Sequence, residues 1–507
     1  MAKLVYSFGK GVAEGSIDMK KILGGKGAGL HEMTRLGIPV PPGFTISTEV
    51  CAGGGAYPPG FEDEVHAALA RLEEAAGRRL GDPRNPLLLS VRSGAAASMP
   101  GMMDTILNLG LNERTVGALA TLTGNRRFAL DAFRRFIQMF GSTVAQVPRE
   151  HFERELTALK AKRGAAHDTE LGEADLTELV ASFLRVYRAE TGEDFPADPR
   201  TQLWRSIAAV IRSWGNDRAK TYRRLYRLEG LLGTAVNVQV MVFGNRGARS
   251  ATGVCFTRDP STGENTFFGE YLRDAQGEDV VAGIRTPRPI AELAREMPAA
   301  HATLLDVKGR LERHLKDMQD LEFTVEEDTV YILQTRTGKR TGAAAVRIAT
   351  ELVDAGMIDR DTALLRVEPA HLEQLLFPVF DPAAKSRALA EKRLLAKGLN
   401  AGPGAASGKI AFTAADAIAR AKAGEAVILV RHETSPEDIG GMVAAQGILT
   451  STGGITSHAA VVARGMGKCC VTGCAAIRID YEGRTLTVAG RTLREGDAIS
   501  LDGGGAR

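Results

Sequence analysis

The segment from Gly453 to Gly465 reads GGITSHAAVVARG and restricts the local fold more than any other part of the chain. Its two leading glycines permit backbone conformations that other residues rarely adopt, and Thr456 and Ser457 are of types that begin helices. The following residues predict a helix over 459–464 that ends at the final glycine. His458 is therefore expected in the first turn, where unpaired N–H groups and the helix dipole favour an anion.

A neutral imidazole in that position can act as a nucleophile near pH 7, so the segment predicts that His458 carries a phosphoryl group covalently. The alternative is a histidine that only packs at a helix start or bonds a carbonyl group, which is the commoner role for an isolated histidine. The flanking Gly-Gly and Thr-Ser pairs favour the phosphate carrier.

Composition places the chain among ordinary globular proteins and limits its partners. The 507 residues predict two to four domains, and a net charge of +3 from 64 basic and 61 acidic residues argues against nucleic acid or a membrane surface as the partner. Five cysteines without a paired CxxC spacing predict reduced thiols. Since neither a signal peptide nor a run of ~20 apolar residues is visible, we expect a cytoplasmic location.

The pattern of helical and strand signals predicts three regions. Residues 1–340 form a nucleotide-binding domain with a helical insertion at about 112–230, residues 341–400 a helical linker, and residues 401–507 a phosphohistidine domain. Within these regions the predicted strands are 235–242, 409–412, 426–430 and 447–450, and the predicted helices include 128–139, 347–354 and 385–397. The glycine-rich stretch 401–408 is predicted as a flexible boundary.

Two short segments near the N-terminus carry cations suited to phosphate. Residues 23–30 read LGGKGAGL, a glycine-rich loop with Lys26 that lacks the GxxxxGK spacing of a Walker loop. Residues 90–94 read SVRSG, where a strand delivers Arg92 into a small polar loop suited to bidentate phosphate recognition. Taken singly, the first segment could be a tight turn before a helix at 30–36, and the second an arginine on the surface.

A third segment, residues 320–336, reads as a β-hairpin with polar side chains on both strands. If its loop holds an odd number of residues, Asp320, Glu322, Gln334 and Arg336 share one face. Oxygen ligands beside an arginine suit magnesium bound to phosphates. A polar outer face of an edge hairpin is the alternative.

The quoted segments, in this order along the chain, resemble the pyruvate, phosphate dikinase family. The histidine segment and its continuation at 466–474, MGKCCVTGC, are similar to that family more than to phosphoenolpyruvate synthases or the enzyme I proteins of sugar phosphotransferase systems. The resemblance implies an α/β (α+β) fold: an ATP-grasp domain with a helical insertion and a swivelling β/β/α phosphohistidine domain. It implies that His458 is pyrophosphorylated and then phosphorylated, and that Thr456 is the threonine that a regulatory protein phosphorylates in some members.

The resemblance also implies roles for residues of the nucleotide domain. ATP and its phosphates would be bound by Lys26, Arg92, Arg135, Glu278, Asp320 and Arg336, with Glu278 toward the ribose and Asp320 in support. Magnesium would be carried by Glu322 and Gln334. One position departs from the family pattern, because Ala96 stands where a basic residue is usual.

The resemblance covers the whole chain, but the family's C-terminal (β/α) barrel, which binds pyruvate or phosphoenolpyruvate, has no counterpart in it. We expect the first half-reactions of ATP + phosphate + pyruvate = AMP + pyrophosphate + phosphoenolpyruvate, with the acceptor half in a separate protein or missing. The chain is then a shortened piece or a natural short homologue, and the glycine-rich end favours the latter. Alternatives are a phosphocarrier or regulatory subunit that binds a separate acceptor protein, and a synthase-like dikinase that uses water. A regulatory kinase or phosphatase and an oligomer are further expected partners.

Overall fold

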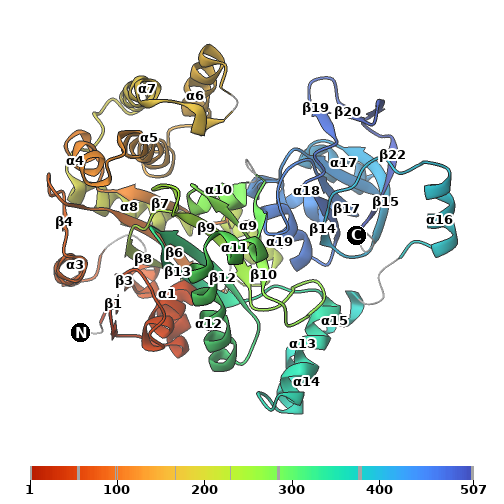
Figure 1. Ribbon diagram of the computed structural model, residues 1–507, viewed down its shortest axis with the longest axis horizontal. Coiled ribbons are helices and arrows are strands. Elements are labelled where there is room, and N and C mark those ends of the chain that lie inside the picture. Colours follow the sequence, from red (N-terminus) through yellow and green to blue (C-terminus); the bar gives the residue numbers. More distant parts are fainter. Residues whose placement is uncertain are drawn as a thin grey trace. The chain divides into compact units, whose positions relative to one another are not determined.

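The computed structural model describes residues 3–503 except 54–56, 98, 100, 166, 229, 283–285 and 375–378. Figure 1 labels its helices and strands. The chain forms two compact units, the first comprising residues 1–242 with Tyr331–Gln334, and the second comprising Phe243–Val330 with residues 335–507. The division at 340 and 400 stays a prediction about functional domains.

The first unit is built on a six-stranded sheet in the order β2-β1-β3-β8-β6-β7. Every pair of neighbours in it is antiparallel. Its strands are β1 (Val5–Gly9), β2 (Val12–Ala13), β3 (Gly43–Ile46), β6 (Leu89–Ala95), β7 (Thr105–Leu109) and β8 (Thr234–Val240). The predicted strand at 235–242 corresponds to β8. Shorter elements complete the N-terminal part, namely α2 (Thr48–Ala52), α3 (Phe61–Ala76) and the pair β4 (Arg79–Leu80) and β5 (Pro86–Leu87).

The glycine-rich segment is not the loop that the sequence predicted, because it lies inside helix α1 (Lys20–Arg35). The helix is broken only at Gly24, where φ is 67° and ψ is 165°. A β-carbon at Gly24 would lie 1.9 Å from the carbonyl oxygen of Gly94, so both the backbone angle and the space require glycine. This kink lets the helix approach β6 at the segment that carries Arg92.

The helical insertion is present as predicted, and Figure 1 shows α4, α5, α6 and α7 gathered in one cluster. Helix α5 (Arg126–Thr143) packs Phe136 and Phe140 against Phe195, with ring centroids 5.4 and 5.3 Å apart. The other helices are α4 (Glu113–Thr123), α6 (Arg149–Arg163), α7 (Glu173–Thr191), α8 (Pro199–Ser213) and α9 (Asp217–Leu225).

The second unit contains a five-stranded sheet in the order β11-β10-β9-β12-β13. Its strands are β9 (Ala251–Phe256), β10 (Phe268–Arg273), β11 (Arg288–Pro289), β12 (Gln319–Glu326) and β13 (Thr329–Thr337), and its helices are α10 (Gly277–Ala282), α11 (Leu293–Glu296) and α12 (Pro298–Leu315). The predicted hairpin is present, but its loop holds two residues, Glu327 and Asp328, both with positive φ. The odd-numbered loop assumed for the shared face is therefore wrong.

The predicted phosphohistidine region folds around a six-stranded sheet in the order β14-β18-β17-β16-β15-β22. Its central strands are parallel and both edge pairs are antiparallel. The strands are β14 (Leu399–Gly402), β15 (Ala405–Ala411), β16 (Val427–Arg431), β17 (Gly447–Thr450), β18 (Cys469–Thr472) and β22 (Ala498–Asp502). The three strands predicted at 409–412, 426–430 and 447–450 are therefore confirmed. The stretch 401–408, however, lies largely in β14 and β15 and is not a flexible boundary.

Apolar residues cover this sheet on both faces. One face packs Leu429 and Cys470 against Met442 of α18 (Ile439–Ala444) and Ala459 of α19 (His458–Gly465). The other face packs onto the three-stranded sheet β19-β20-β21, formed by Arg478–Asp480, Thr485–Val488 and Arg491–Arg494. Helix α17 (Ala414–Lys422) completes the region. The result is the β/β/α arrangement expected from the resemblance.

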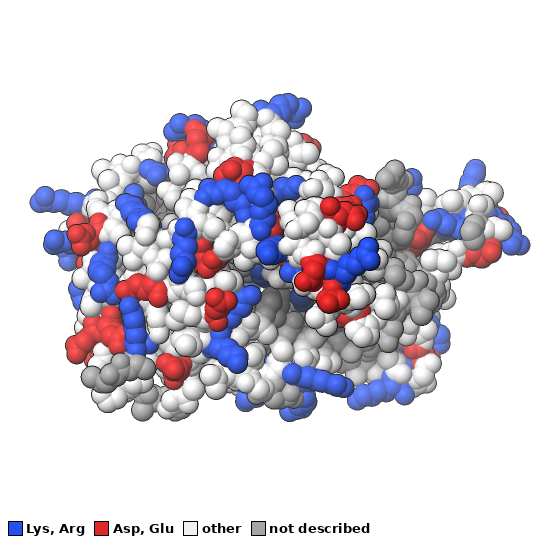
Figure 2. All heavy atoms as spheres, turned by 90° about the horizontal axis from the view of Figure 1, so that it is seen from below, with Lys and Arg blue, Asp and Glu red and all other residues white. Residues whose placement is uncertain are grey.

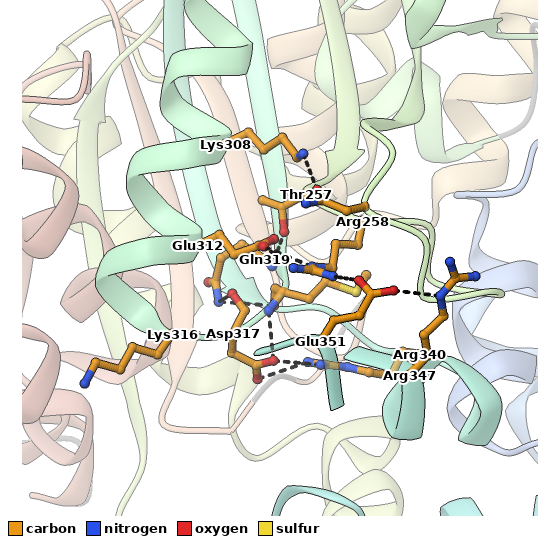
Figure 3. Close-up of polar contacts among 12 residues, drawn as sticks. Thr257, Arg258, Lys308, Glu312, Lys316, Asp317, Gln319, Arg340, Arg347 and Glu351 are labelled. Carbon is orange, nitrogen blue, oxygen red and sulfur yellow. Dashed lines mark hydrogen bonds and ion pairs between the residues drawn. The ribbon is translucent and has the colours of Figure 1, made fainter. Parts of the chain in front are cut away.

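Short helices connect the two sheets of the second unit: α13 (Gly342–Asp354), α14 (Arg360–Arg366), α15 (Pro369–Gln374) and α16 (Pro382–Ala390). The predicted helix at 347–354 is part of α13, whereas the one at 385–397 is too long, because α16 ends at Ala390. Buried Arg258 ties α13 to α12 by donating to Glu312 at 2.9 Å and to Glu351 at 2.5 Å (Figure 3).

The chain thus has a mixed helix and sheet fold, as predicted. Lysine, arginine, aspartate and glutamate side chains are interspersed on the face shown in Figure 2, in keeping with the small net charge. Among the described residues, helices with the length and apolarity needed to cross a bilayer are absent.

Candidate functional site

His458 is the first residue of α19, as the sequence predicted, and Ser457 is the N-cap residue. The hydroxyl of Thr434, in the loop after β16, lies 2.9 Å from Nδ1 of the imidazole. Within the described residues, Nε2 of His458 and the hydroxyl of Ser457 have no hydrogen-bond partner. An imidazole that donates from Nδ1 to Thr434 keeps its lone pair on Nε2, so the ring presents a nucleophilic nitrogen that no other group occupies.

The surroundings of His458 favour the neutral ring. Burial lowers the pKa of His458 from its ordinary value of 6.5, and the charge of Lys339 lowers it further, whereas Asp438 and Glu437 act in the opposite direction. The charged imidazolium is disfavoured because a half-buried ring loses solvation. The ring is therefore available as a nucleophile at neutral pH.

Glu270, in β10, holds the backbone in front of the histidine. Its carboxylate accepts hydrogen bonds from the Thr456 hydroxyl at 2.9 Å, the Thr456 N–H at 3.3 Å and the Ile455 N–H at 3.2 Å. A β-carbon at Gly454 would lie 2.3 Å from the same carboxylate, so the second glycine of the motif is needed for close approach. Burial raises the pKa of Glu270, while these hydrogen bonds oppose the rise.

Sequence reasoning missed Glu270, and the signal available for it was slight. It is a single charge in the apolar stretch Phe267–Leu272. A charged residue inside a strand that is otherwise buried needs a partner, but the sequence does not say which one.

Arg464 lies in the last turn of α19 and is 2% exposed. Its Nη2 donates to the carbonyl oxygen of Ile455 at 3.0 Å, while its Nε and Nη1 have no hydrogen-bond partner within the described residues. Arg464 thus links the last turn of α19 to the segment that precedes the helix, and it places a buried positive charge next to that segment.

The hairpin of β12 and β13 brings two of its predicted residues together. Arg336 donates from Nε to Asp320 at 2.6 Å, and Asp320 is 3% exposed. Burial raises the pKa of Asp320 despite the arginine, and its second oxygen, Oδ1, has no hydrogen-bond partner in the described part of the chain. This buried orphan oxygen and the half-buried Glu322 form a donor set that fits a hard cation such as magnesium. Gln334 belongs to the first unit, so its part in such a site stays a prediction.

Among the described residues, groups of three or more histidine, cysteine, aspartate or glutamate side chains that could hold a metal are absent. A magnesium ion at Asp320 and Glu322 would therefore need phosphate oxygens or water for most of its coordination.

Lys26 lies against β6, the strand that carries Arg92, in the first unit. A β-carbon at Gly94, two residues after Arg92, would lie 3.3 Å from Cβ of Lys26. The half-buried Arg92 donates from Nη1 to the carbonyl oxygen of Leu333 at 3.4 Å. A β-carbon at Gly25 would lie 3.5 Å from the carbonyl oxygen of Ala96, so this segment meets the glycine-rich helix through its backbone.

Two further predicted residues are less clearly placed at a site. Arg135 lies on α5 and donates to Asp131 at 3.1 Å, while Arg134 donates to the same carboxylate at 2.8 Å. These arginines hold the pKa of Asp131 well below its usual range against the effect of burial. Glu278 lies in α10, and its side chain is outside the described part of the structure.

Comparison with known proteins identifies two family segments. The model of "Pyruvate phosphate dikinase, AMP/ATP-binding domain" matches residues 20–53, 57–303 and 294–356, and that of "PEP-utilising enzyme, mobile domain" matches residues 423–505. The chain is 54% identical over 508 aligned residues to "Pyruvate, phosphate dikinase" of Clostridium symbiosum, covering 99% of this chain and 57% of that protein. It is 54% identical over 504 residues to "Pyruvate, phosphate dikinase 2" of Zea mays, covering 98% and 56% respectively. The chain thus spans little more than half the length of these relatives.

Proposed function

Because the chain belongs to the pyruvate, phosphate dikinase family, we propose that it performs the nucleotide half of that chemistry, in which His458 takes a phosphoryl group from ATP. The proposal is supported above all by the hydrogen bonding of the two nitrogens of the His458 imidazole. Thr434 holds Nδ1 at 2.9 Å, and Nε2 has no partner among the described residues. Buried His31 also has an Nε2 without a partner in the described part of the chain, but the open nitrogen of His458 lies in the first turn of α19, where backbone N–H groups favour an anion.

The reaction consists of two displacements. The Nε2 lone pair attacks the β-phosphorus of ATP, the bond from that phosphorus to the α,β-bridging oxygen breaks, and AMP leaves. An oxygen of inorganic phosphate then attacks the terminal phosphorus of pyrophosphoryl-His458. The bridging bond breaks, pyrophosphate leaves, and phospho-His458 remains.

Residues of the chain would bind and orient the reacting groups, since catalysis of phosphoryl transfer depends mainly on position and electrostatics. Lys26, Arg92 and Arg336 would neutralise phosphate oxygens, while Arg135 and Glu278 would contact the phosphate and the nucleotide. Asp320 and Glu322, with Gln334, would hold magnesium, which neutralises charge on the phosphates when bound. Thr434 would keep the proton on Nδ1 and so the lone pair on Nε2.

The acceptor half belongs to a further domain in this proposal. Phospho-His458 would pass its phosphoryl group to pyruvate bound by a barrel domain, on a longer chain or on a separate protein. The β/β/α region would swivel between the two sites. Because 401–408 lies in strands, the pivot would lie in 391–398, between α16 and β14.

Thr456 would be the position for regulation by a separate kinase and phosphatase. Thr456 is 2% exposed and its hydroxyl donates to Glu270, so a phosphate there would meet a carboxylate of like charge. Thr456→Asp should therefore block the labelling of His458, whereas Thr456→Val should retain part of it. Equal labelling of the two variants would contradict this role.

The proposal is tested with β-labelled ATP, magnesium and inorganic phosphate. The protein should become labelled and should form AMP, while His458→Asn should do neither. The nearby exposed His432 provides a matched control, and His432→Asn should label as the unchanged protein does. Label on His458→Asn would refute the proposal, and AMP formation that does not depend on phosphate would indicate the water-using reaction instead.

A further inference from the structure

Lys339 is held in place by its neighbours in the chain. It lies in the segment 338–341 that follows β13, and Gly338 donates its N–H to the carbonyl oxygen of Met318 at 3.0 Å. On the other side, Arg340 donates to both oxygens of Asp317, at 2.7 and 3.1 Å (Figure 3). The N–H of Thr341 donates to the carbonyl oxygen of Pro260 at 3.0 Å. The backbone at Lys339 is therefore anchored on both sides.

The side chain of Lys339 lies against the helix that carries the histidine. A β-carbon at Gly465, the last residue of α19, would be 3.2 Å from Nζ and 3.4 Å from Cδ of the lysine. Glycine at this position therefore leaves the space that the lysine occupies. The negative end of the helix dipole also favours a cation there.

The ammonium group of Lys339 has no direct counterion. Within the described residues it makes neither a hydrogen bond nor an ion pair. Asp320 attracts it from a longer range, but the Oδ2 atom of that carboxylate already accepts from Arg336 at 2.6 Å. Burial lowers the pKa of Lys339 to about 8, and the positive charge of Arg336 contributes to the shift. A half-buried cation beside a second cation is unfavourable unless an anion joins them.

We propose that Lys339 binds a phosphoryl group, of ATP or of inorganic phosphate. The packing of α19 against Lys339, which we call the seated position of α19, is then favourable only when that group is bound. With the site empty, placing α19 against Lys339 strips water from a charge that has no partner. When a phosphoryl group is bound, the same contact places Lys339 and Arg336 next to its negative charge. Because binding couplings are reciprocal, a seated α19 should also tighten the binding of that anion.

This inference rests on the proposed function, and the experiment separates the two. The experiment measures binding affinity by calorimetry, with inorganic phosphate in one arm and magnesium–ATP in the other. Both arms use the unchanged full chain and its variants Lys339→Met and Lys339→Arg. Exposed Lys422 on α17 gives the control Lys422→Met. We expect Lys339→Met to weaken binding about tenfold in at least one arm, and the arm affected identifies the source of the phosphoryl group. Lys339→Arg should restore most of the affinity.

The pH dependence gives a readout that a purely structural role would not move. Asp320 and Arg336 are the charged groups that act on Lys339 from the strands. On α19 the titratable groups are Arg464, beside Gly465, and His458, whose pKa the charge of Lys339 lowers. Since the pKa of Lys339 is about 8, affinity in the sensitive arm should fall as pH rises through 8 in the unchanged protein but not in Lys339→Met. Gly465→Ala should weaken binding in the same arm but less than Lys339→Met, because its methyl group, 3.2 Å from Nζ, would shift the lysine side chain.

Unchanged affinity of Lys339→Met in both arms would overturn the inference, provided that its thermal unfolding matches that of Lys422→Met. If Lys339→Met unfolds early, Lys339→Arg and Gly465→Ala decide, and normal affinity in Gly465→Ala overturns the inference. If the unchanged protein labels on His458 while these variants bind normally, the inference alone fails. If the unchanged protein does not label at all, the proposed function fails.

Discussion

Replacing Glu270 by alanine removes the carboxylate that holds the backbone in front of the histidine. Three donors lose their acceptor: the Thr456 hydroxyl at 2.9 Å and the N–H groups of Thr456 and Ile455 at 3.3 and 3.2 Å. The hydroxyl has the shortest of these contacts, and one hydrogen bond to a charged group contributes about 1.5–3 kcal/mol. The two longer contacts add less, and the desolvation of Glu270 offsets part of the sum. We therefore expect Glu270→Ala to destabilise the packing of the histidine segment at this position by about 3 kcal/mol.

A cost of about 3 kcal/mol corresponds to roughly a hundredfold change in an equilibrium constant, at ~1.4 kcal/mol for each tenfold. If His458 must be seated to react, single-turnover labelling by β-labelled ATP should slow by up to that factor in Glu270→Ala. Glu270→Gln keeps one acceptor oxygen and should slow labelling about tenfold. Affinity for ATP, measured by calorimetry, should fall much less than the labelling rate, because Glu270 contacts the histidine segment and not the predicted phosphate ligands, and only the coupling through a seated α19 is lost.

The control for Glu270 is an exposed glutamate in the turn before β20, and Glu482→Gln should label at the unchanged rate. The reasoning is refuted if Glu270→Ala is folded and labels within twofold of the unchanged protein. A loss of ATP affinity that accounts for the slower labelling would refute it equally, since the effect would then lie at the nucleotide.

Three further predictions concern the histidine and the fold. Thr434→Val should slow the labelling of His458 about tenfold while Thr434→Ser retains it, because only serine keeps a hydroxyl near Nδ1; equal rates in single-turnover assays would contradict this. Because burial lowers the pKa of His458, the acid limb of labelling should have its midpoint below pH 6.5, and Asp438→Asn should move it lower still, since that carboxylate raises the pKa; a midpoint above 6.5 in a pH series would be the contrary result. Arg258→Met should lower the free energy of unfolding by about 3 kcal/mol because it leaves the buried carboxylate of Glu312 without its partner, whereas Arg347→Met at an exposed pair should cost less than about 1 kcal/mol; similar losses in urea titrations would show that the Arg258 pairs add no special stability.

Predictions from the sequence were most accurate where glycines and N-cap residues a few positions away determine the local structure. The glycines and N-cap types before His458 act within a few residues, so the helix start was predicted correctly. The glycine-rich segment misled because glycine permits a loop without requiring one, and contact of Gly24 with Gly94 fixes a kinked helix instead. In the hairpin, Glu327 and Asp328 both adopt positive φ and form a two-residue turn, so the odd-numbered loop assumed for the shared face was wrong.

The residues that complete the site were beyond the reach of local patterns. Glu270 lies 186 residues before its partner Thr456 in the chain, and Lys339 meets Gly465 across a comparable separation. Such contacts depend on which sheets and helices pack together, and no spacing within a single segment records that. The family resemblance supplied the predicted nucleotide ligands but said nothing of these two residues.

The central claim is that Nε2 of His458 takes the phosphoryl group. Protein labelled with ¹⁵N-histidine, treated with ATP, magnesium and phosphate, can be measured by nitrogen and phosphorus NMR to identify the phosphorylated nitrogen. The account predicts a phosphorus coupled to Nε2 of His458 alone, with Nδ1 still protonated beside Thr434. A phosphorus on Nδ1, on another histidine or on no histidine would contradict it.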